Sequence, residues 1–519
     1  MGARQLDLAR GALSARPTPW LDLVVAAGGG ALWALCFGQT ERIVLPWIAL
    51  APLVWLLGRP RAALLGLVHG TVTWIVAIPW IIPTLVTYGE IPRTIAIVLL
   101  TLLAAYLGAY HAAFVWLGRA LWRRGGAALL ALPALWCLLE VARSWLISGF
   151  PWNLAGTAWI AMPGALDAAA WIGVYGVSFL LVLANMGIAY GIARRQWEPA
   201  LAAALTALLV LAVAARWAGP QPEPGPAVAV RILQPNTPIL NFADRVEIAA
   251  AYQKMLGLTR EACDQKGALV LWPESAGWPN VLERDAAFRA EIEALAARGC
   301  PILLNSPRFD GDRVYNSAFL VERGKSATYY DKRHLVPFGE YVPLQQVLPF
   351  VGALARNAGS FAASDRISLL RFGPVTLGLA ICFEVTFPVE VAALARQGAS
   401  ALATLTNDAW YGDSAAPWQH LRAARFRAAE NHRTMLRAAL TGISAWIEPD
   451  GSIASSLGVG AQGILRGDLA PRLELTPYAR APWAVPIACA VFGVAALAFV
   501  ILQRRRRASS ANGDYHSLR

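Results

Sequence analysis

Three short segments carry side chains that could perform covalent chemistry. Glu274 stands in Leu-Trp-Pro-Glu-Ser, Lys332 in Tyr-Tyr-Asp-Lys-Arg-His, and Cys382 in Leu-Ala-Ile-Cys-Phe-Glu. Burial at the rim of a sheet raises the pKa of a glutamate and suits it to general-base work. A fixed lysine can stabilise an oxyanion, and a cation beside a thiol lowers the pKa of that thiol and activates it. The residue types therefore predict covalent catalysis with Cys382 as the nucleophile, its pKa lowered by Lys332.

Each of these residues alone has a plainer explanation. The glutamate could be a loop residue or a helix cap, the lysine part of an exposed basic loop, and the cysteine an inert core residue. His334 has no partner at metal-ligand spacing, so we predict a structural role for it, and no zinc-type Cys/His spacing occurs. We accordingly predict neither a metal nor a cofactor. Cys263 and Cys300 could form a disulfide in an oxidising compartment, and the sequence leaves that question open.

The residues from 228 to about 470 alternate between short apolar runs and amphipathic stretches. Such alternation predicts a layered α/β domain that positions the three reactive residues near strand ends. The expected strands are 228–233, 268–272, 301–305, 314–322, 375–381, 401–406 and 443–448. The expected helices are 244–263, 283–298, 388–397 and 417–431.

The remainder of the chain has the composition of a membrane protein. Of the 519 residues 57% are hydrophobic and 15% are charged, and this is too little charge to cover a soluble surface of that size. A spanning helix needs about 20 apolar residues. We predict a multi-span helical bundle with spans at roughly 20–38, 43–58, 62–84, 94–118, 126–147, 168–193, 199–217 and 482–502.

The net charge of +12 reflects membrane topology and not a nucleic-acid partner, because the arginines cluster between apolar runs. One set of ends and loops carries Arg4, Arg10, Arg16, Arg59, Arg61, Arg119, Arg123, Arg124, Arg194, Arg195 and Arg504 to Arg507. The alternate loops carry Arg42 and Arg93. By the positive-inside rule both termini are cytoplasmic and the α/β domain lies outside. The expected division is a cytoplasmic tail 1–19, seven spans 20–217, a linker 218–227, a catalytic domain 228–480, an eighth span 481–502 and a basic tail 503–519.

In chain order, the strand-end Glu274, Lys332 in its Tyr-Asp-Lys-Arg-His-Leu-Val-Pro-Phe-Gly-Glu string, and Cys382 before Phe-Glu resemble the Glu-Lys-Cys triad of the nitrilase superfamily. A domain of that kind placed before the last of eight spans resembles the bacterial apolipoprotein N-acyltransferases, the membrane-anchored branch. Further matching strings are Gly-Phe-Pro-Trp at 149–152, Thr-Asn-Asp-Ala-Trp-Tyr-Gly at 406–412, and Gln-His-Leu at 419–421 ahead of Arg425 and Arg427. The resemblance covers nearly the whole chain and implies an αββα nitrilase-like sandwich outside the cytoplasm.

This resemblance implies residue roles. It makes Glu274 the general base, Lys332 the oxyanion stabiliser and Cys382 the nucleophile, with Glu340 and Glu384 as supporting carboxylates. The residues it places near substrate are Trp152, Tyr341, Val342, Leu344, Phe383 and Trp410. Two departures from the family pattern are Phe242, where a tryptophan is usual, and the string around Leu440, which lacks the usual polar residues.

The resemblance also implies a reaction and a location. An acyl chain passes from a phospholipid, through a thioester on the cysteine, to the α-amine of the diacylglyceryl-cysteine of an apolipoprotein. The site would be periplasmic, on the bacterial inner membrane. The alternatives are a membrane-anchored nitrilase-like amidase, which would admit water to the thioester, and a transporter or receptor in which the triad is coincidental.

Two further predictions concern segments beside the site. Glu140 and Arg143 lie three residues apart in a predicted span, so we expect them to pair and to position the loop that bears Trp152. The alternative is a helix end that reaches interfacial water. The apolar residues at 337–351 predict a mobile cover over the site toward the membrane, with ordinary core packing as the alternative.

Overall fold

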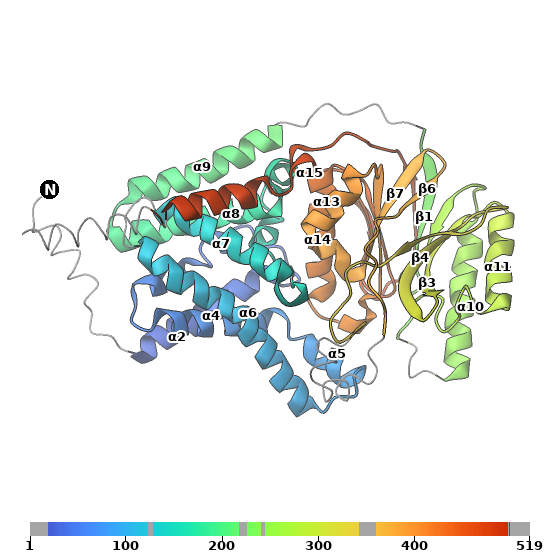
Figure 1. The fold of residues 1–519 in the computed structure, drawn as a ribbon, viewed down its shortest axis with the longest axis horizontal. Helices are drawn as coiled ribbons and strands as arrows, with labels where there is room; N and C mark the ends of the chain where they lie inside the picture. Colours follow the sequence, from blue (N-terminus) through green and yellow to red (C-terminus); the bar gives the residue numbers. More distant parts are fainter. Residues whose placement is uncertain are drawn as a thin grey trace, which may run out of the picture.

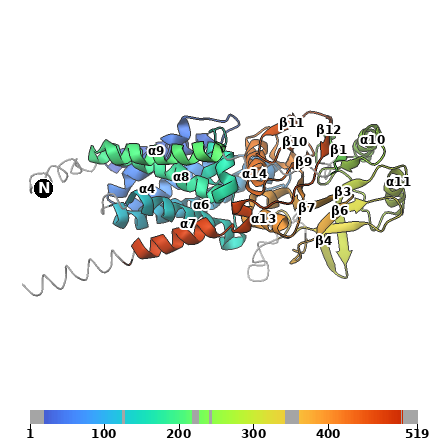
Figure 2. The ribbon, with the colours of Figure 1, turned by 90° about the horizontal axis from the view of Figure 1, so that it is seen from above.

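The computed structural model describes residues 19–122, 128–216, 226–239, 244–341, 360–496 and 498. A bundle of long helices lies at one end of the molecule and an α/β domain at the other (Figure 1). The C-terminal helix, Ala484–Ala496, leaves the α/β domain and runs back along the bundle (Figure 2). The arrangement agrees with the expected insertion of the α/β domain between membrane helices.

Among the described residues, five helices are long and apolar enough to cross a membrane, beginning with Trp20–Phe37, which contains most of α2 (Pro19–Ala34). The others are α6 (Arg93–Trp122), α7 (Ala128–Trp145, extended to Ser148), α8 (Ala165–Arg194) and α9 (Trp197–Arg216). The pair α4 (Ala62–Ala77) and α5 (Ile81–Thr87), bent by 57°, is a further candidate. These apolar helices make the chain a membrane protein.

The expected second span is instead three short helical segments: η2 (Leu45–Trp47), α3 (Ala51–Trp55) and η3 (Leu56–Gly58). Pro46 and Pro52 explain the interruption. Each lies in the first turn of its segment, where proline is tolerated, and neither fits the interior of one continuous helix. Of the expected eighth span, the structure describes the short apolar helix Ala484–Ala496, in which Cys489 packs against Cys137 of α7.

The described part of the α/β domain forms two six-stranded sheets. The first has the order β12 (Gly463–Leu469), β1 (Val228–Gln234), β2 (Leu269–Leu271), β3 (Ile302–Asp310), β4 (Arg313–Val321), β5 (Thr328–Asp331). The second has the order β11 (Ile453–Leu457), β10 (Ser444–Ile447), β9 (Met435–Ala439), β8 (Ala401–Thr406), β7 (Val375–Ile381), β6 (Leu369–Phe372).

The two sheets face each other, since side chains of both, such as Leu271 and Leu379, share one buried cluster. Helices α10 (Arg245–Ala262) and α11 (Ala286–Ala297) cover the first sheet. Helices α13 (Pro388–Arg396) and α14 (Ala416–Asn431) cover the second and lie toward the bundle (Figure 2). The layers therefore follow the order helix, sheet, sheet, helix, and the predicted αββα sandwich is confirmed.

Every strand and helix expected in this domain is present, with ends shifted by a few residues. The strands that the sequence did not reveal are β5, β6, β9, β11 and β12. Of these, β11 (Ile-Ala-Ser-Ser-Leu) is largely exposed at a sheet edge and shows no alternation of apolar and polar residues. A disulfide joins Cys263 at the end of α10 to Cys300 just before β3, which answers the question that the sequence left open.

Candidate active site

The structure brings Glu274, Lys332 and Cys382 together at one edge of the sandwich. Glu274 follows β2, Lys332 follows β5, and Cys382 follows β7 at the beginning of the short helix η8 (Cys382–Thr386). The Nζ of Lys332 is 3.8 Å from Oε1 of Glu274 and 2.9 Å from Oε1 of Glu340. All four side chains are buried, and Cys382 lies close enough to Glu274 and Lys332 to interact electrostatically with both.

Burial sets the proton affinity of the cysteine and the glutamate. It raises the pKa of the Cys382 thiol, the Glu274 charge raises it further, and Lys332 opposes both. The expectation of a lowered thiol pKa was therefore wrong, because desolvation of the thiolate outweighs the lysine. Burial also raises the pKa of Glu274, as expected, against the opposing charge of Lys332. A protonated thiol consequently faces a carboxylate of raised basicity.

Lys332 keeps its proton in this environment. Burial by itself lowers the pKa of this ammonium group, but the carboxylates of Glu340 and Glu274 outweigh burial and raise it. Glu340 also accepts a hydrogen bond from the backbone N–H of Val336 at 2.8 Å. The lysine is thus a permanently charged donor, held by the same carboxylate that orders the segment after it.

Cys382 has an unusual backbone conformation, with φ of 52° in the left-handed region, which costs energy for a residue with a side chain. Glu384 fixes the turn by accepting hydrogen bonds from the N–H of Ile381 (2.7 Å) and of Arg333 (2.7 Å) and from the hydroxyl of Tyr330 (2.9 Å). Burial raises the pKa of Glu384 to about 7. Glu384 therefore ties the turn that carries Cys382 to the segment that carries the lysine.

Asn316, on β4, contacts the carboxylates of both Glu274 and Glu340, and this role was not predicted from the sequence. Its Nδ2 donates to Oε1 of Glu274 (3.0 Å) and to Oε1 of Glu340 (2.7 Å). The backbone N–H of Asn407 donates to the other oxygen of Glu274 at 3.0 Å. An asparagine within a largely apolar strand was the available signal, since that residue type is depleted in strands.

His420, Asp408 and Arg437 form a second buried group next to Cys382. Their contacts with one another were not predicted from the sequence. The Nε2 of His420 is 3.0 Å from the carbonyl oxygen of Cys382, and its Nδ1 is 3.2 Å from Oδ1 of Asp408. Arg437 donates to Oδ2 of Asp408 at 2.5 Å. Burial raises the pKa of Asp408, but Arg437, His420 and Thr406 together outweigh burial and hold this pKa at about 2. The group therefore keeps a charged pair, Asp408 and Arg437, next to the turn that carries Cys382.

Trp152, from the loop after α7, reaches this turn from the bundle side. Its ring stacks on Phe383 with ring centroids 6.4 Å apart and on His420 at 5.5 Å. Trp410 lies farther toward the bundle, with its ring 5.0 Å from that of Tyr88. Aromatic side chains of the bundle and of the α/β domain thus form one buried apolar cluster beside Cys382.

The structure describes some residues of the expected substrate site and not others. Tyr341 is half-buried and pairs with Pro337 in a short bridge. Val342 and Leu344, and with them most of the expected cover at 337–351, lie outside the described residues. Phe242 also lies outside them, whereas Leu440 is buried and its backbone N–H donates to Thr406 at 3.1 Å.

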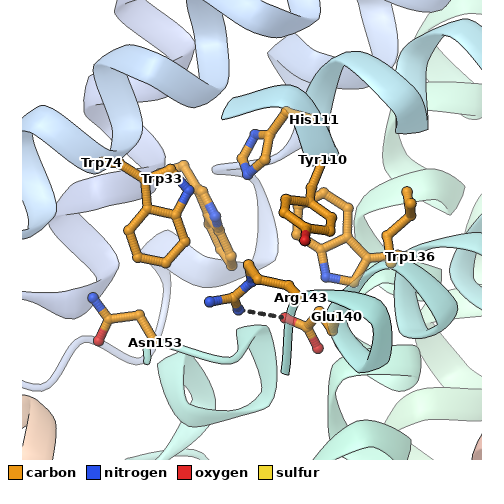
Figure 3. A pocket seen from close by; sticks show the side chains of 9 residues that line it. Trp33, Trp74, Tyr110, His111, Trp136, Glu140, Arg143 and Asn153 are labelled. Atoms are coloured by element: carbon orange, nitrogen blue, oxygen red, sulfur yellow. Dashed lines mark ion pairs between the residues drawn. The ribbon is translucent and has the colours of Figure 1, made fainter. Parts of the chain in front are cut away.

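Glu140 and Arg143 pair as predicted, and they hold the loop that bears Trp152. Their charged groups are 3.9 Å apart and both side chains are buried (Figure 3). Arg143 donates to the carbonyl oxygens of Phe150 (2.6 Å) and Trp152 (2.7 Å), and Glu140 accepts from the N–H of Ala155 (2.6 Å). The pair faces the protein interior, where charged groups in a span are usually found.

His334 has the structural role expected of it. Its Nδ1 is 3.0 Å from Oε1 of Glu390 and its Nε2 is 2.6 Å from the carbonyl oxygen of Ser148, in the turn after α7. Its ring lies 3.6 Å from that of Phe387. The histidine therefore connects the catalytic domain to the bundle. Among the described residues no cluster of three or more His, Cys, Asp or Glu side chains could hold a metal ion.

Comparisons with known proteins agree with both parts of the structure. Residues 29–187 match the apolipoprotein N-acyltransferase N-terminal domain, and residues 228–478 match the carbon-nitrogen hydrolase domain. The apolipoprotein N-acyltransferase of Geobacter metallireducens is 36% identical over 87% of this chain and 90% of its own length. That of Methylococcus capsulatus is 34% identical over 95% and 98%. A solved nitrilase-superfamily amidase from Nesterenkonia sp. AN1 is 23% identical over 50% of this chain and 95% of its own, with a TM-score of 0.38.

Proposed function

This chain belongs to the apolipoprotein N-acyltransferase family, and we propose that Cys382, Glu274 and Lys332 carry out its acyl transfer through a thioester. The enzyme N-acylates lipoproteins. We propose that the acyl donor is a phospholipid and that the acceptor is the α-amine of a diacylglyceryl-cysteine. The observation that supports these roles is the convergence of a thiol, a basic carboxylate and a charged lysine in one buried space.

In the first half-reaction, Glu274 takes the proton of the Cys382 thiol as the sulfur attacks the ester carbonyl of the phospholipid. A preformed base is needed because burial keeps the thiol protonated. Lys332 donates a hydrogen bond to the oxyanion of the tetrahedral intermediate. The intermediate collapses with cleavage of the C–O bond, and the departing lysophospholipid oxygen takes the proton from Glu274. The acyl chain remains on Cys382 as a thioester.

In the second half-reaction, the α-amine of the lipoprotein attacks the thioester carbonyl. Glu274, again a carboxylate, takes a proton from the attacking nitrogen, and Lys332 again stabilises the oxyanion. The C–S bond breaks, the amide forms, and the proton held by Glu274 returns to the sulfur. The enzyme recovers its starting state, so the cycle consumes one phospholipid and one lipoprotein.

The surroundings of the nucleophile favour acyl transfer over hydrolysis. Phe383 follows Cys382 directly and belongs to the buried aromatic cluster shared with Trp152 and other bundle residues. An acyl chain can therefore reach the sulfur along apolar side chains, which favour a lipid substrate over a small polar amide. A membrane-anchored amidase is correspondingly less supported.

We propose that the enzyme lies in the bacterial inner membrane with the catalytic domain on the periplasmic side and both termini in the cytoplasm. Two observations support this orientation. The arginines of the sequence gather in alternate loops and at both ends. The Cys263–Cys300 disulfide is of a kind that persists in oxidising compartments such as the periplasm. The proposed catalytic domain is 228–480, after a linker at 218–227.

The proposal can be tested by mixing the purified enzyme with phospholipid and measuring its intact mass. We expect an increase equal to one acyl chain, located on Cys382 and removable by hydroxylamine. Adding a diacylglyceryl-cysteine peptide should discharge the adduct and yield the N-acylated peptide. An adduct that water discharges equally fast without the peptide would instead indicate a hydrolase, and the absence of any adduct would contradict the thioester.

A further inference from the structure

Gln419, in the first turn of α14, is buried at the contact between the catalytic domain and the bundle. Its Oε1 accepts hydrogen bonds from the indole N–H of Trp152 (2.7 Å) and of Trp80 (3.3 Å). Its Nε2 donates to the carbonyl oxygens of Phe37 (3.0 Å) and Ala77 (2.9 Å). All the hydrogen-bonding capacity of this amide is used, and the reverse orientation of the amide would set donors against donors.

The two carbonyl groups explain why an amide fits here. Ala77 ends α4 at the bend before α5, and Phe37 ends the short helix η1 (Leu35–Phe37) that extends α2. Carbonyl groups in the last turn of a helix lack partners within that helix. Gln419 satisfies both from the catalytic domain, and its oxygen then faces the two tryptophans. Because an unsatisfied buried polar group is costly, the four bonds hold one another in place.

Trp152, which makes the shortest of these four hydrogen bonds, is also the tryptophan that lies beside the proposed nucleophile. Trp152 stacks on Phe383, the residue after Cys382, and on His420, the residue after Gln419. A cavity of about 10 Å³, close to the size of one water molecule, lies against Trp152 and is also lined by Gln419 and Thr386. The ring therefore has room to tilt if its N–H loses its acceptor.

From these contacts we propose that Gln419 is a positioning residue for acyl transfer, which fixes the indole of Trp152 as the wall of the acyl-chain site. This inference rests on the proposed thioester mechanism. Gln419 touches no reacting atom and acts through the tryptophan. Loosening the wall weakens binding of the acyl chain in the ground state and in the transition state alike, so KM for phospholipid rises while the limiting rate stays.

The test is a double-mutant cycle on the full-length enzyme in vesicles of phosphatidylethanolamine and phosphatidylglycerol, measuring the rate of Cys382 acylation against phospholipid content. Gln419→Leu removes the acceptor, and Trp152→Phe removes the indole N–H and keeps a ring. Each should raise KM by about 3- to 10-fold, as expected for one buried hydrogen bond. The double variant should be no worse than the poorer single variant, because both changes remove the same bond.

Trp159→Phe is the matched control. Trp159 is a fully buried bundle tryptophan whose indole N–H meets no acceptor in the part of the chain that the structure describes, so KM should not change. If Gln419→Leu does not insert, Gln419→Asn shortens the amide and takes its place. Multiplying effects in the double variant, or an unchanged KM in Trp152→Phe, would overturn the role of Gln419. Absence of the adduct in the unmodified enzyme would instead contradict the mechanism itself.

Discussion

Replacing Asn316 by leucine should move the pH dependence of Cys382 acylation without destroying the site. Asn316 gives one N–H to Glu274 and the other to Glu340. Leucine has a similar volume but no donor, so both carboxylates lose a bond that favours their charged form. The backbone carbonyl of Asn316, which accepts from the N–H of Lys332 at 2.8 Å, is unaffected. Asn305 loses its bond to Oδ1 of Asn316 (2.6 Å) but keeps its bond to the carbonyl of Ser317 at 2.9 Å.

The expected size of the shift follows from the bond that is lost. A hydrogen bond to a charged group contributes about 1.5–3 kcal/mol, and about 1.4 kcal/mol corresponds to one pKa unit. Glu274 keeps its hydrogen bond from the N–H of Asn407 and its attraction to Lys332. We therefore use the lower end of this energy range and expect the pKa of Glu274 to rise by about one unit. The base acts when deprotonated, so activity is lost from the acid side, about 10-fold at a given pH on the slope.

The assay is single-turnover formation of the Cys382 acyl adduct between about pH 5 and about pH 9, a range that brackets a raised carboxyl pKa. The acid limb should shift upward in Asn316→Leu while the plateau at high pH stays within about 2-fold, because the deprotonated base is still present there. Thr404→Val is the control on β8, since the described residues offer its buried hydroxyl no hydrogen-bond partner. An acid limb at the same pH in Asn316→Leu and in the unmodified enzyme would refute the assignment of Glu274 as the base.

Further predictions address the nucleophile, its helpers and the pair behind it. Cys382→Ala and Cys382→Ser should both abolish the acyl adduct while membrane insertion is retained, because a serine hydroxyl needs a stronger base; transfer by either variant would exclude the thioester. Glu274→Gln should leave the thiol protonated and prevent acylation, and normal adduct formation would remove Glu274 from the mechanism. Lys332→Ala should slow acylation by about 100-fold or more, as measured by rapid quench, and a smaller loss would indicate that backbone donors suffice. Asp408→Asn should strand the buried Arg437 and lower the melting temperature, with a cost of about 3–5 kcal/mol; an unchanged melting temperature would show that the pair contributes little.

The sequence by itself determined the two-part architecture and the candidate triad. Apolar runs of spanning length and the alternation of short strands with helices depend on local periodicity, which a linear sequence carries. Glu274 and Cys382 could be placed at strand ends because each follows an apolar run directly. The pairing of Glu140 with Arg143 was also predictable, since their spacing of three residues puts them on one helix face.

Tertiary structure decided how these residues are charged and which partners they have. The direction of the Cys382 pKa shift depends on burial, which outweighs the neighbouring lysine and is a property of the folded site. Asn316 and Gln419 were not foreseen in their roles, because their partners lie 42 residues away at Glu274 and 267 residues away at Trp152. Exposed edge strands such as β11 gain their register from a neighbouring strand and carry no alternating pattern of their own. Contacts of this kind arise only when the chain brings distant segments together, so residue type and spacing cannot disclose them.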